Sequence, residues 1–382
     1  MTAGWLAHGA IAAAGAALLL SACAGSGPKP APLVDFEPQA RAQVAWRASV
    51  DAAGRYRFTP AVADGAVFAT GSAGELARFD AERGRAVWRA ETRATLSGGI
   101  GLGAGMLLLG TAEGAVLAYD TDGKLLWRSQ VSSEVLSAPT GTATTVVVRS
   151  GDGRIFGLDA KDGSRRWEYQ ATLPPLILRA NPGIVVVNDN AAVAGLPGGK
   201  LVVLNIANGS LLWETSVATP RGDNELERIA DIPGTPLVEP ERVCAVTYQG
   251  RVGCYETARG TQIWSRTASS AGSLGADGTT LYYTAENGSV VALDKVSGAS
   301  VWTQDALFQR KVSAPLAFQR WVVVGDYEGY VHFLSRDDGS FVTRVATDGS
   351  GVLAQPVTLG DRVLVQTRRG GVFAIAVADR RR

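Results

Sequence analysis

Few side chains in this sequence could carry out acid–base, nucleophilic or metal chemistry. Histidine occurs twice in the 382 residues, and only His332 lies beyond the N-terminal segment. It sits in the expected strand Gly329-Tyr-Val-His-Phe-Leu, where we predict a structural role. No His and Glu have metal-binding spacing, and no Gly-x-Ser-x-Gly motif is present. A net charge of +1 gives no basic surface for nucleic acid. The composition therefore argues against a conventional catalytic or nucleic-acid-binding site.

Cys23 has the setting of a lipid attachment point. It follows an apolar run at residues 11–20, which has secretory h-region length and is too short to span a bilayer. The sequence Leu20-Ser21-Ala22-Cys23 resembles a bacterial lipobox. We predict a lipoprotein signal peptide at residues 1–22, although residues 1–10 lack the usual Lys or Arg. The alternative is an ordinary signal peptide with an incidental Cys. Ala24, rather than Asp, follows the Cys, and enteric-type sorting would then imply outer-membrane delivery.

Residues 23–40 join the lipidated Cys to the remaining chain. They are rich in Gly, Pro and Ser, and Pro28, Pro30, Pro32 and Pro38 interrupt any helix or strand ladder. We predict a flexible tether here, followed by a single domain at residues 41–382.

The other two cysteines, Cys244 and Cys254, flank a turn centred on Gln249-Gly250. That turn would place them opposite each other on paired strands. An oxidising periplasm permits a disulfide, but directly opposed strand positions do not always meet disulfide geometry. The sequence leaves both a disulfide and two buried free thiols open.

One sequence motif recurs along the chain and determines the architecture. A complete copy is Gly114-Ala-Val-Leu-Ala-Tyr-Asp120-Thr-Asp-Gly123-Lys-Leu-Leu-Trp127, an alternating apolar run, a Gly-bearing turn and a short run ending in Trp. Each unit of about 40 residues contains four short strands separated by Gly and Asp turns, which is the pattern of a propeller blade. We predict an all-β chain with four antiparallel strands per blade, in which the tryptophans fill the wedges between blades.

The repeats number eight. The series of tryptophans comprises Trp46, Trp88, Trp127, Trp167, Trp213, Trp264 and Trp302, with Thr343 in the eighth place. The strands led by Gly begin at Gly74, Gly114, Gly153, Gly199, Gly250, Gly288, Gly329 and Gly371. The two series are out of phase, because Trp46 has no Gly-led strand before it and Gly371 no Trp strand after it. We predict an eight-bladed ring closed by N- and C-terminal strands that share a blade, which removes the free sheet edge. The blade with Thr343 must fill its wedge with something smaller, helped by Phe341.

Two neighbouring links in the repeat are long. Trp127 to Pro139 spans 12 residues, whereas Trp167 to Pro182 spans 15 and Trp213 to Pro236 spans 23. Both long links connect an outer strand to the inner strand of the next blade, so we expect them side by side on one face. Insertions of this kind carry function in repeat proteins.

The two links differ in composition. The first, residues 173–182, is apolar with one Arg, and the second, residues 219–233, is charged and has the pattern of one or two helical turns. Exposed aliphatic residues beside Arg and acids are typical of a protein-binding hot spot. The structural alternative is that Leu176 and Leu178 only pack the link onto the blades.

The repeat Ala-x-Asp-x-x-x-Gly-x-x-x-Trp resembles the tryptophan-docking repeat of pyrroloquinoline-quinone (PQQ) enzymes. With a lipobox, a short tether and one eight-bladed ring, nearly the whole mature chain resembles the BamB family, propeller lipoproteins of the outer-membrane β-barrel assembly machinery. The resemblance implies a non-catalytic scaffold without a cofactor, held by lipid on the periplasmic face of the outer membrane. It would dock the polypeptide-transport (POTRA) domains of a BamA-type barrel subunit, contact other lipoproteins of the machinery indirectly, and aid nascent outer-membrane proteins.

Carried over from the family, the contact residues of the first link are Leu176, Leu178 and Arg179. Those of the second are Arg228 and Asp231, within Arg228-Ile-Ala-Asp231. The family has another acid two residues beyond, where this chain has Pro233. Glu225 or Glu227 would have to substitute for it.

Two other functions remain as alternatives. A PQQ-dependent dehydrogenase would hold the quinone and a calcium ion in the central funnel, but this chain has no vicinal Cys pair and no obvious cluster of acids and amides for calcium. A periplasmic propeller scaffold would share the fold and bind a different protein partner.

Overall fold

The computed structural model describes residues 28–180 and 182–379. The predicted signal peptide and Cys23 lie outside the described residues. No helix within the described ranges combines the length and the apolarity that a membrane span needs.

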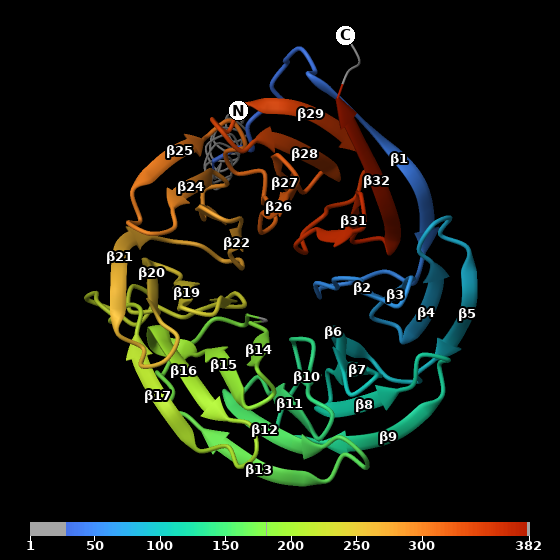
Figure 1. Cartoon of the computed structure of the whole chain (residues 1–382), viewed down its shortest axis with the longest axis vertical. Coiled ribbons are helices and arrows are strands. Elements are labelled where there is room, and N and C mark those ends of the chain that lie inside the picture. Colours follow the sequence, from blue (N-terminus) through green and yellow to red (C-terminus); the bar gives the residue numbers. More distant parts are fainter. Residues whose placement is uncertain (1–27, 181, 380–382) are drawn as a thin grey trace, which may run out of the picture.

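Eight four-stranded antiparallel sheets are arranged around a central axis as the blades of a propeller (Figure 1). From inner to outer strand, the first four blades are β2 (Ala61–Ala63), β3 (Ala66–Thr70), β4 (Glu75–Asp80) and β5 (Ala86–Glu91); β6 (Leu96–Gly103), β7 (Met106–Thr111), β8 (Ala115–Tyr119) and β9 (Leu125–Gln130); β10 (Thr140–Gly141), β11 (Thr145–Arg149), β12 (Arg154–Asp159) and β13 (Arg165–Gln170); and β14 (Ile184–Val187), β15 (Ala191–Gly195), β16 (Lys200–Asn205) and β17 (Leu211–Ser216). The other four are β18 (Leu237–Val238), β19 (Arg242–Val246), β20 (Gly250–Glu256) and β21 (Gln262–Ala268); β22 (Gly275–Ala276), β23 (Thr280–Thr284), β24 (Val290–Asp294) and β25 (Ser300–Gln304); β26 (Leu316–Phe318), β27 (Trp321–Gly325), β28 (Tyr330–Ser335) and β29 (Phe341–Ala346); and β30 (Val357–Leu359), β31 (Arg362–Gln366), β32 (Gly371–Asp379) and β1 (Ala40–Ser49). One short helical turn, η1 (Pro197–Gly199), joins β15 to β16 within the described chain.

The ring closes as the sequence predicts. The N-terminal strand β1 is the outer strand of the last blade and pairs antiparallel with β32, from Ala40 opposite Asp379 to Ser49 opposite Gly371. This pairing joins the two ends of the described chain through a ladder of backbone hydrogen bonds. The eight-bladed, all-β prediction is confirmed.

The second and third strands of each blade are unbroken apolar runs because they are buried. The second and third strands are covered on both faces by neighbouring blades, as in β7, where all six residues are buried. The core accordingly consists of clusters that span blade junctions. In one of them, Leu108 and Val116 of one blade meet Val146 and Phe156 of the next.

Each docking tryptophan joins its blade to the next one. Its indole lies against the glycine of the following blade's turn between third and outer strands, and its Nε1 donates to a backbone carbonyl there. A Cβ on Gly84, where φ is +67°, would lie 2.4 Å from Cε3 of Trp46, so only glycine fits both the backbone and the contact. Seven junctions carry this hydrogen bond at 2.8–3.1 Å, namely Trp46–Ala81, Trp88–Thr121, Trp127–Ala160, Trp167–Ile206, Trp213–Thr257, Trp264–Lys295 and Trp302–Arg336.

A bulge in every outer strand directs the tryptophan inward. In the first blade, Arg78 pairs with Trp88 and Phe79 with Ala86, which leaves Val87 unpaired and 59% exposed. The same register shift recurs at each pairing of third and outer strands. Such a bulge re-aims the side chain that follows it.

The eighth junction explains why Thr343 replaces a tryptophan. The blade that follows it is the shared one, whose third strand β32 and outer strand β1 come from opposite ends of the chain. It therefore has no hairpin turn between these strands on which an indole could dock. Thr343 is buried. Phe341 does not help to fill this wedge, because it packs with the cluster of Trp302 at the junction with the preceding blade and stacks on Phe36, with ring centroids 5.3 Å apart.

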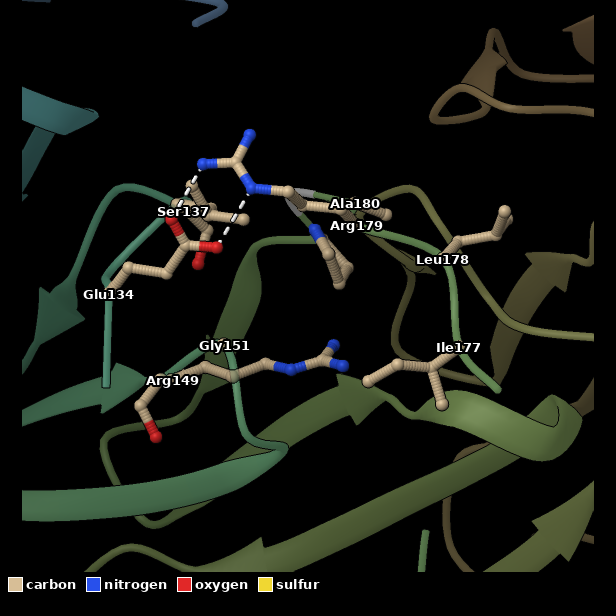
Figure 2. Close-up of a pocket in the computed structure, with 11 residues that line it drawn as sticks. Glu134, Ser137, Arg149, Gly151, Ile177, Leu178, Arg179 and Ala180 are labelled. Carbon is tan, nitrogen blue, oxygen red and sulfur yellow. Dashed lines mark hydrogen bonds and ion pairs between the residues drawn. The ribbon is translucent and has the colours of Figure 1, made fainter. Parts of the chain in front are cut away.

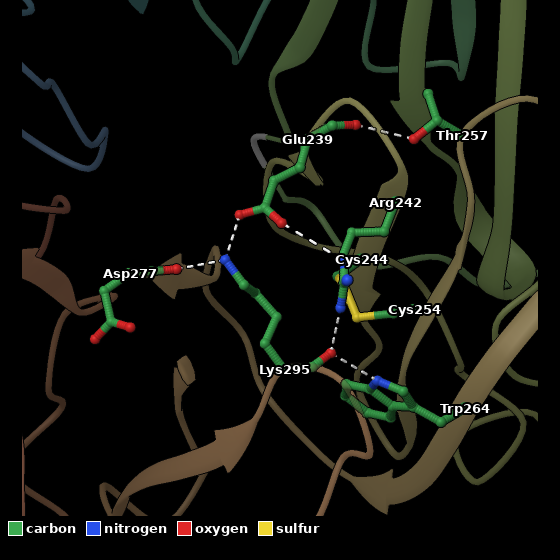
Figure 3. Close-up of a disulfide and its surroundings, with 8 residues drawn as sticks. All are labelled: Glu239, Arg242, Cys244, Cys254, Thr257, Trp264, Asp277 and Lys295. Atoms are coloured by element: carbon green, nitrogen blue, oxygen red, sulfur yellow. Dashed lines mark hydrogen bonds and ion pairs between the residues drawn. A yellow bond between two sulfur atoms is a disulfide. The ribbon is translucent and has the colours of Figure 1, made fainter. Parts of the chain in front are cut away.

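Cys244 and Cys254 are directly opposed on β19 and β20, and the structure links them by a disulfide (Figure 3). Their Cα atoms are 4.1 Å apart, and both residues are fully buried beside Trp264. Close by, the buried Lys295 pairs with Glu239 from the neighbouring blade. The disulfide thus sits in the core of a blade and not at an exposed site.

Candidate partner-binding site

The two long links emerge on one face of the ring. Within a blade, successive strands alternate in direction, so links from an outer strand to the next inner strand share a face with turns between second and third strands. We call this face the loop face. It carries the link between β13 and β14, which contains Leu176, and the link between β17 and β18, which contains Asp231.

Asp231 ties the two links together. One carboxylate oxygen, Oδ2, accepts the backbone N–H of Leu178 at 2.6 Å, and the other accepts the N–H of Gly198 at 2.8 Å. Asp231 is only 3% exposed, so these bonds are shielded from water. The predicted proximity of the two links is confirmed. The buried carboxylate of Asp231 fixes the position of Leu178 through the backbone N–H of that residue. Whether a partner also contacts Asp231 stays a prediction.

Arg179 is held at the surface by an acid that the sequence does not single out. Its Nε and Nη2 donate to the two carboxylate oxygens of Glu134 at 2.9 and 2.6 Å, a bidentate pair between two links (Figure 2). The guanidinium also lies over the ring of Tyr56, 5.6 Å from its centroid. The hydrogen bonds to Glu134 raise the pKa of Arg179. Its side chain is 45% exposed, so Arg179 is both fixed and accessible.

Beneath this pair, a cavity of about 230 Å³ separates Arg179 from a second arginine, Arg149 at the end of β11. The Arg149 guanidinium points toward the Ile177 side chain (Figure 2), and its Nη1 donates to the Gly195 carbonyl at 2.6 Å. Burial lowers the pKa of Arg149 to about 10, partly opposed by the negative charge of Asp231. Arg149 therefore remains a cation at neutral pH. It supports the first link from the opposite side of the cavity.

The aliphatic side chains of the first link divide between the surface and the cavity. Leu176 is 39% exposed, whereas Ile177 and Leu178 are half-buried and line the cavity. The packing alternative therefore describes Leu178 better than Leu176. On the second link, Leu226 is 67% exposed, an aliphatic residue that the sequence reasoning did not select.

The second link forms a single turn at residues 225–228, with a hydrogen bond from Arg228 N–H to the Asn224 carbonyl at 3.2 Å. Arg228 is exposed and pairs with Glu225 at 3.1 Å. Glu227 accepts the backbone N–H of Asp223 and the Asn224 amide. Both acids that could replace the missing family acid are thus used within the turn. Pro233, which stands in its place, is buried.

Sequence reasoning missed Glu134, Tyr56 and Arg149, which fix the first link. Glu134 comes from the link between β9 and β10, 45 residues before Arg179, and Tyr56 from the link between β1 and β2. A carboxylate seven residues after Trp127 is a weak signal, because many polar residues occupy such links. Arg179, Glu134 and Tyr56 come from three different links, and these links meet only when the ring is closed.

His332 has the structural role that the sequence predicts. It is fully buried on β28, and its Nε2 lies 3.0 Å from Oδ2 of Asp326. Within the described residues, no group of three or more His, Cys, Asp and Glu side chains could hold a metal ion.

The ring and its seven indole contacts define the class of protein: an eight-bladed propeller built from PQQ-like tryptophan-docking repeats. The model of the family described as outer membrane protein assembly factor BamB matches residues 37–95, 72–304 and 286–382. The chain therefore belongs to the BamB family.

Relatives of this family align over most of the chain. The outer membrane protein assembly factor BamB of Burkholderia pseudomallei is 38% identical over 366 residues, 95% of this chain and 96% of that protein. Its counterpart in Nitrosomonas eutropha is 42% identical over 321 residues, 84% of this chain and 78% of that protein. The crystal structure of BamB from Moraxella catarrhalis has a TM-score of 0.82 and 22% identity, covering 88% of this chain and all of that one, which supports the fold.

Proposed function

We propose that this chain is a non-catalytic scaffold of the machinery that assembles outer-membrane β-barrel proteins. It would act as an outer-membrane-associated subunit on the periplasmic side, anchored by a lipid on Cys23. Membership of the BamB family and relatives named as outer membrane protein assembly factors support the role. The observation that carries the proposed site is that Leu176 and Arg179, both exposed on the loop face, flank Leu178, whose backbone is held by Asp231.

We propose that this site docks the POTRA domains of the barrel subunit. Leu176 offers an apolar anchor that loses little conformational freedom on binding, because Asp231 holds the backbone two residues further on. Arg179 keeps its third guanidinium nitrogen pointing away from Glu134 (Figure 2), which suits it to an acceptor on the partner. Leu226 and Arg228 extend the surface onto the second link.

The chemistry of the central cavity supports a scaffold rather than a quinone-dependent dehydrogenase. This cavity of about 350 Å³ is lined by residues of all eight blades. Its lining contains Arg57 and Gln355 but no carboxylate. Calcium needs several oxygen ligands, usually including carboxylates, so this lining does not fit a calcium–quinone pair. Calorimetry with saturating quinone and calcium tests the assignment: a heat of binding would favour the enzyme.

Binding of the purified POTRA domains tests the docking site. Arg179→Glu is expected to weaken binding at least tenfold, about 1.4 kcal/mol, because it places a carboxylate beside Glu134 and removes the donor. Leu176→Ala should also weaken it. Arg166→Glu is the matched control, since Arg166 is an exposed arginine that pairs with Asp159 on the outside of the ring. Full-strength binding by a folded Arg179→Glu protein would remove the site.

A further inference from the structure

Residues 28–39, which precede β1, lie against the blade formed by β26–β29; we call them the strap. The Ala31 N–H donates to the Phe308 carbonyl and the Gln39 N–H to the Val342 carbonyl, both at 2.9 Å. Between these points, Arg344 donates to the Val34 carbonyl at 3.3 Å. From Ala31 to Gln39, the predicted tether is thus bound to the ring.

A buried ionic cluster holds the first of these contacts. Arg310 is 2% exposed and donates through Nη1 to the Ala31 carbonyl at 2.8 Å. Its Nε and Nη2 donate to Asp326 at 2.9 and 2.7 Å, and Nη2 also contacts Glu328. His332 shares the same Asp326 oxygen. Because a buried guanidinium is costly to desolvate, a carbonyl that completes its hydrogen bonds is held firmly.

The second half of the strap packs on β29. Phe36 stacks on Phe341, and the Arg344 guanidinium lies 5.3 Å from the Phe36 ring centroid. Phe341 also packs with the cluster that contains Trp302 of the preceding blade. The strap therefore adds an aromatic and a cationic contact on the side of β29 that faces the preceding blade.

The strap crosses the edge of the ring from one face to the other. Phe308 and Arg310 lie in the link between β25 and β26, which belongs to the loop face. Phe341 begins β29, at the opposite face, where β1 also begins. Ala31 consequently lies at the loop face. In Figure 1 this blade lies across the ring from β13, so Ala31 does not cover the link that contains Leu176.

From this route we infer that the strap turns the loop face toward the membrane. The inference rests on the proposed lipid at Cys23. Cys23 lies eight positions before Ala31, and a fully extended chain of that length spans at most about 29 Å. A lipid on Cys23 therefore lies within that reach of the loop face, at the edge opposite the candidate partner site. This edge of the ring faces the bilayer surface. The POTRA domains would bind the loop face at the opposite edge of the ring.

Amide hydrogen exchange tests the docking of the strap. The amides of Ala31 and Gln39 should be protected in the full chain. The double variant Phe36→Ala, Arg344→Gln should lose this protection at Gln39 while β1 stays protected. Arg128→Gln is the matched control, because Arg128 directly follows Trp127 as Arg344 follows Thr343, and it lies on a blade that the strap does not touch. Free exchange of both strap amides in the unaltered protein would overturn the inference.

Energy transfer to a membrane dye tests the orientation. Donors are placed on one blade, at Glu113→Cys in a loop-face turn or Asp122→Cys in an opposite-face turn; both residues are exposed. The five-residue strand β8 separates these two turns by about 17 Å. With the acylated full chain in vesicles that carry an acceptor lipid, transfer should be greater from residue 113 than from residue 122. The strap double variant should reduce the difference, and Arg128→Gln should retain it.

The outcomes separate this inference from the proposed function. Equal transfer from the two donors, or greater transfer from residue 122, overturns the orientation even if POTRA binding is intact. Arg179→Glu should weaken POTRA binding at least tenfold and leave the transfer difference unchanged. If mass spectrometry of the purified protein finds no acyl chain on Cys23, the orientation fails together with the proposed anchor, whereas POTRA binding remains a separate measurement.

Discussion

Asp231 provides the sharpest test of how the candidate site is built. Its buried carboxylate accepts two backbone N–H groups, from Leu178 and Gly198. Hydrogen bonds to a charged group contribute about 1.5–3 kcal/mol each, so Asp231→Ala should cost about 3–6 kcal/mol. For a ring of roughly 350 residues, with an unfolding entropy of about 2.1 cal/mol/K per residue, this corresponds to a fall in Tm of about 4–8 °C.

The assay combines thermal unfolding with amide exchange. Exchange at Leu178 and Gly198 should accelerate in Asp231→Ala, because both donors lose their acceptor, while exchange in β13 stays unchanged. POTRA binding should weaken as well, although Asp231 itself is buried. Asp223→Ala, an exposed acid of the same link, is the matched control. An Asp231→Ala protein with the Tm and the Leu178 exchange rate of the control would refute the assignment of Asp231 as the link between the loops.

Three further predictions concern the core. Burial lowers the pKa of His332, and its carboxylate partner opposes this shift. As the pH falls, the unfolded chain therefore binds a proton at His332 before the folded chain does. The unfolding free energy, measured by urea titration, should fall as the pH drops below about 6.5, with a slope approaching 1.4 kcal/mol per pH unit. The His332→Gln variant should lack this pH dependence. Removing the disulfide with Cys244→Ser and Cys254→Ser should cost about 2–3 kcal/mol and make unfolding insensitive to reductant; equal stability would contradict this. Gly339→Ala, whose Cβ would meet an indole at 2.5 Å with φ at +73°, should lower Tm more than Gly360→Ala, which has open space at φ +58°; similar shifts would argue against the docking contact.

The fold could be predicted because each blade repeats the same local constraints. Gly at a turn, an alternating apolar run and Trp at a fixed spacing each have a physical role within one unit. The phase difference between Trp46 and Gly371 then predicts the shared blade. Thr343 could be recognised as an exception but not explained, because its reason is the absence of a hairpin in the shared blade.

The candidate site was only partly predictable, for a different physical reason. Composition and link length indicated the two links, and the resemblance to the family singled out Leu176 and Arg179, which are both accessible on the loop face. The sequence did not distinguish a carboxylate that faces a partner from one that holds a backbone, so Asp231 was expected to be a contact and is buried. Glu134 lies on another link, and only the closed ring brings it to Arg179. Such contacts depend on how blades pack around the axis, which no local pattern encodes.

The most direct test of the central claim is photocrosslinking in intact outer membranes. A photoreactive amino acid replaces either Leu176 on the loop face or Leu212, a 52% exposed leucine on the outside of β17. Docking through the loop face predicts a crosslink to the POTRA domains of the barrel subunit from position 176 and none from position 212. Crosslinks of equal yield from both positions, or from position 212 alone, would contradict docking through the loop face.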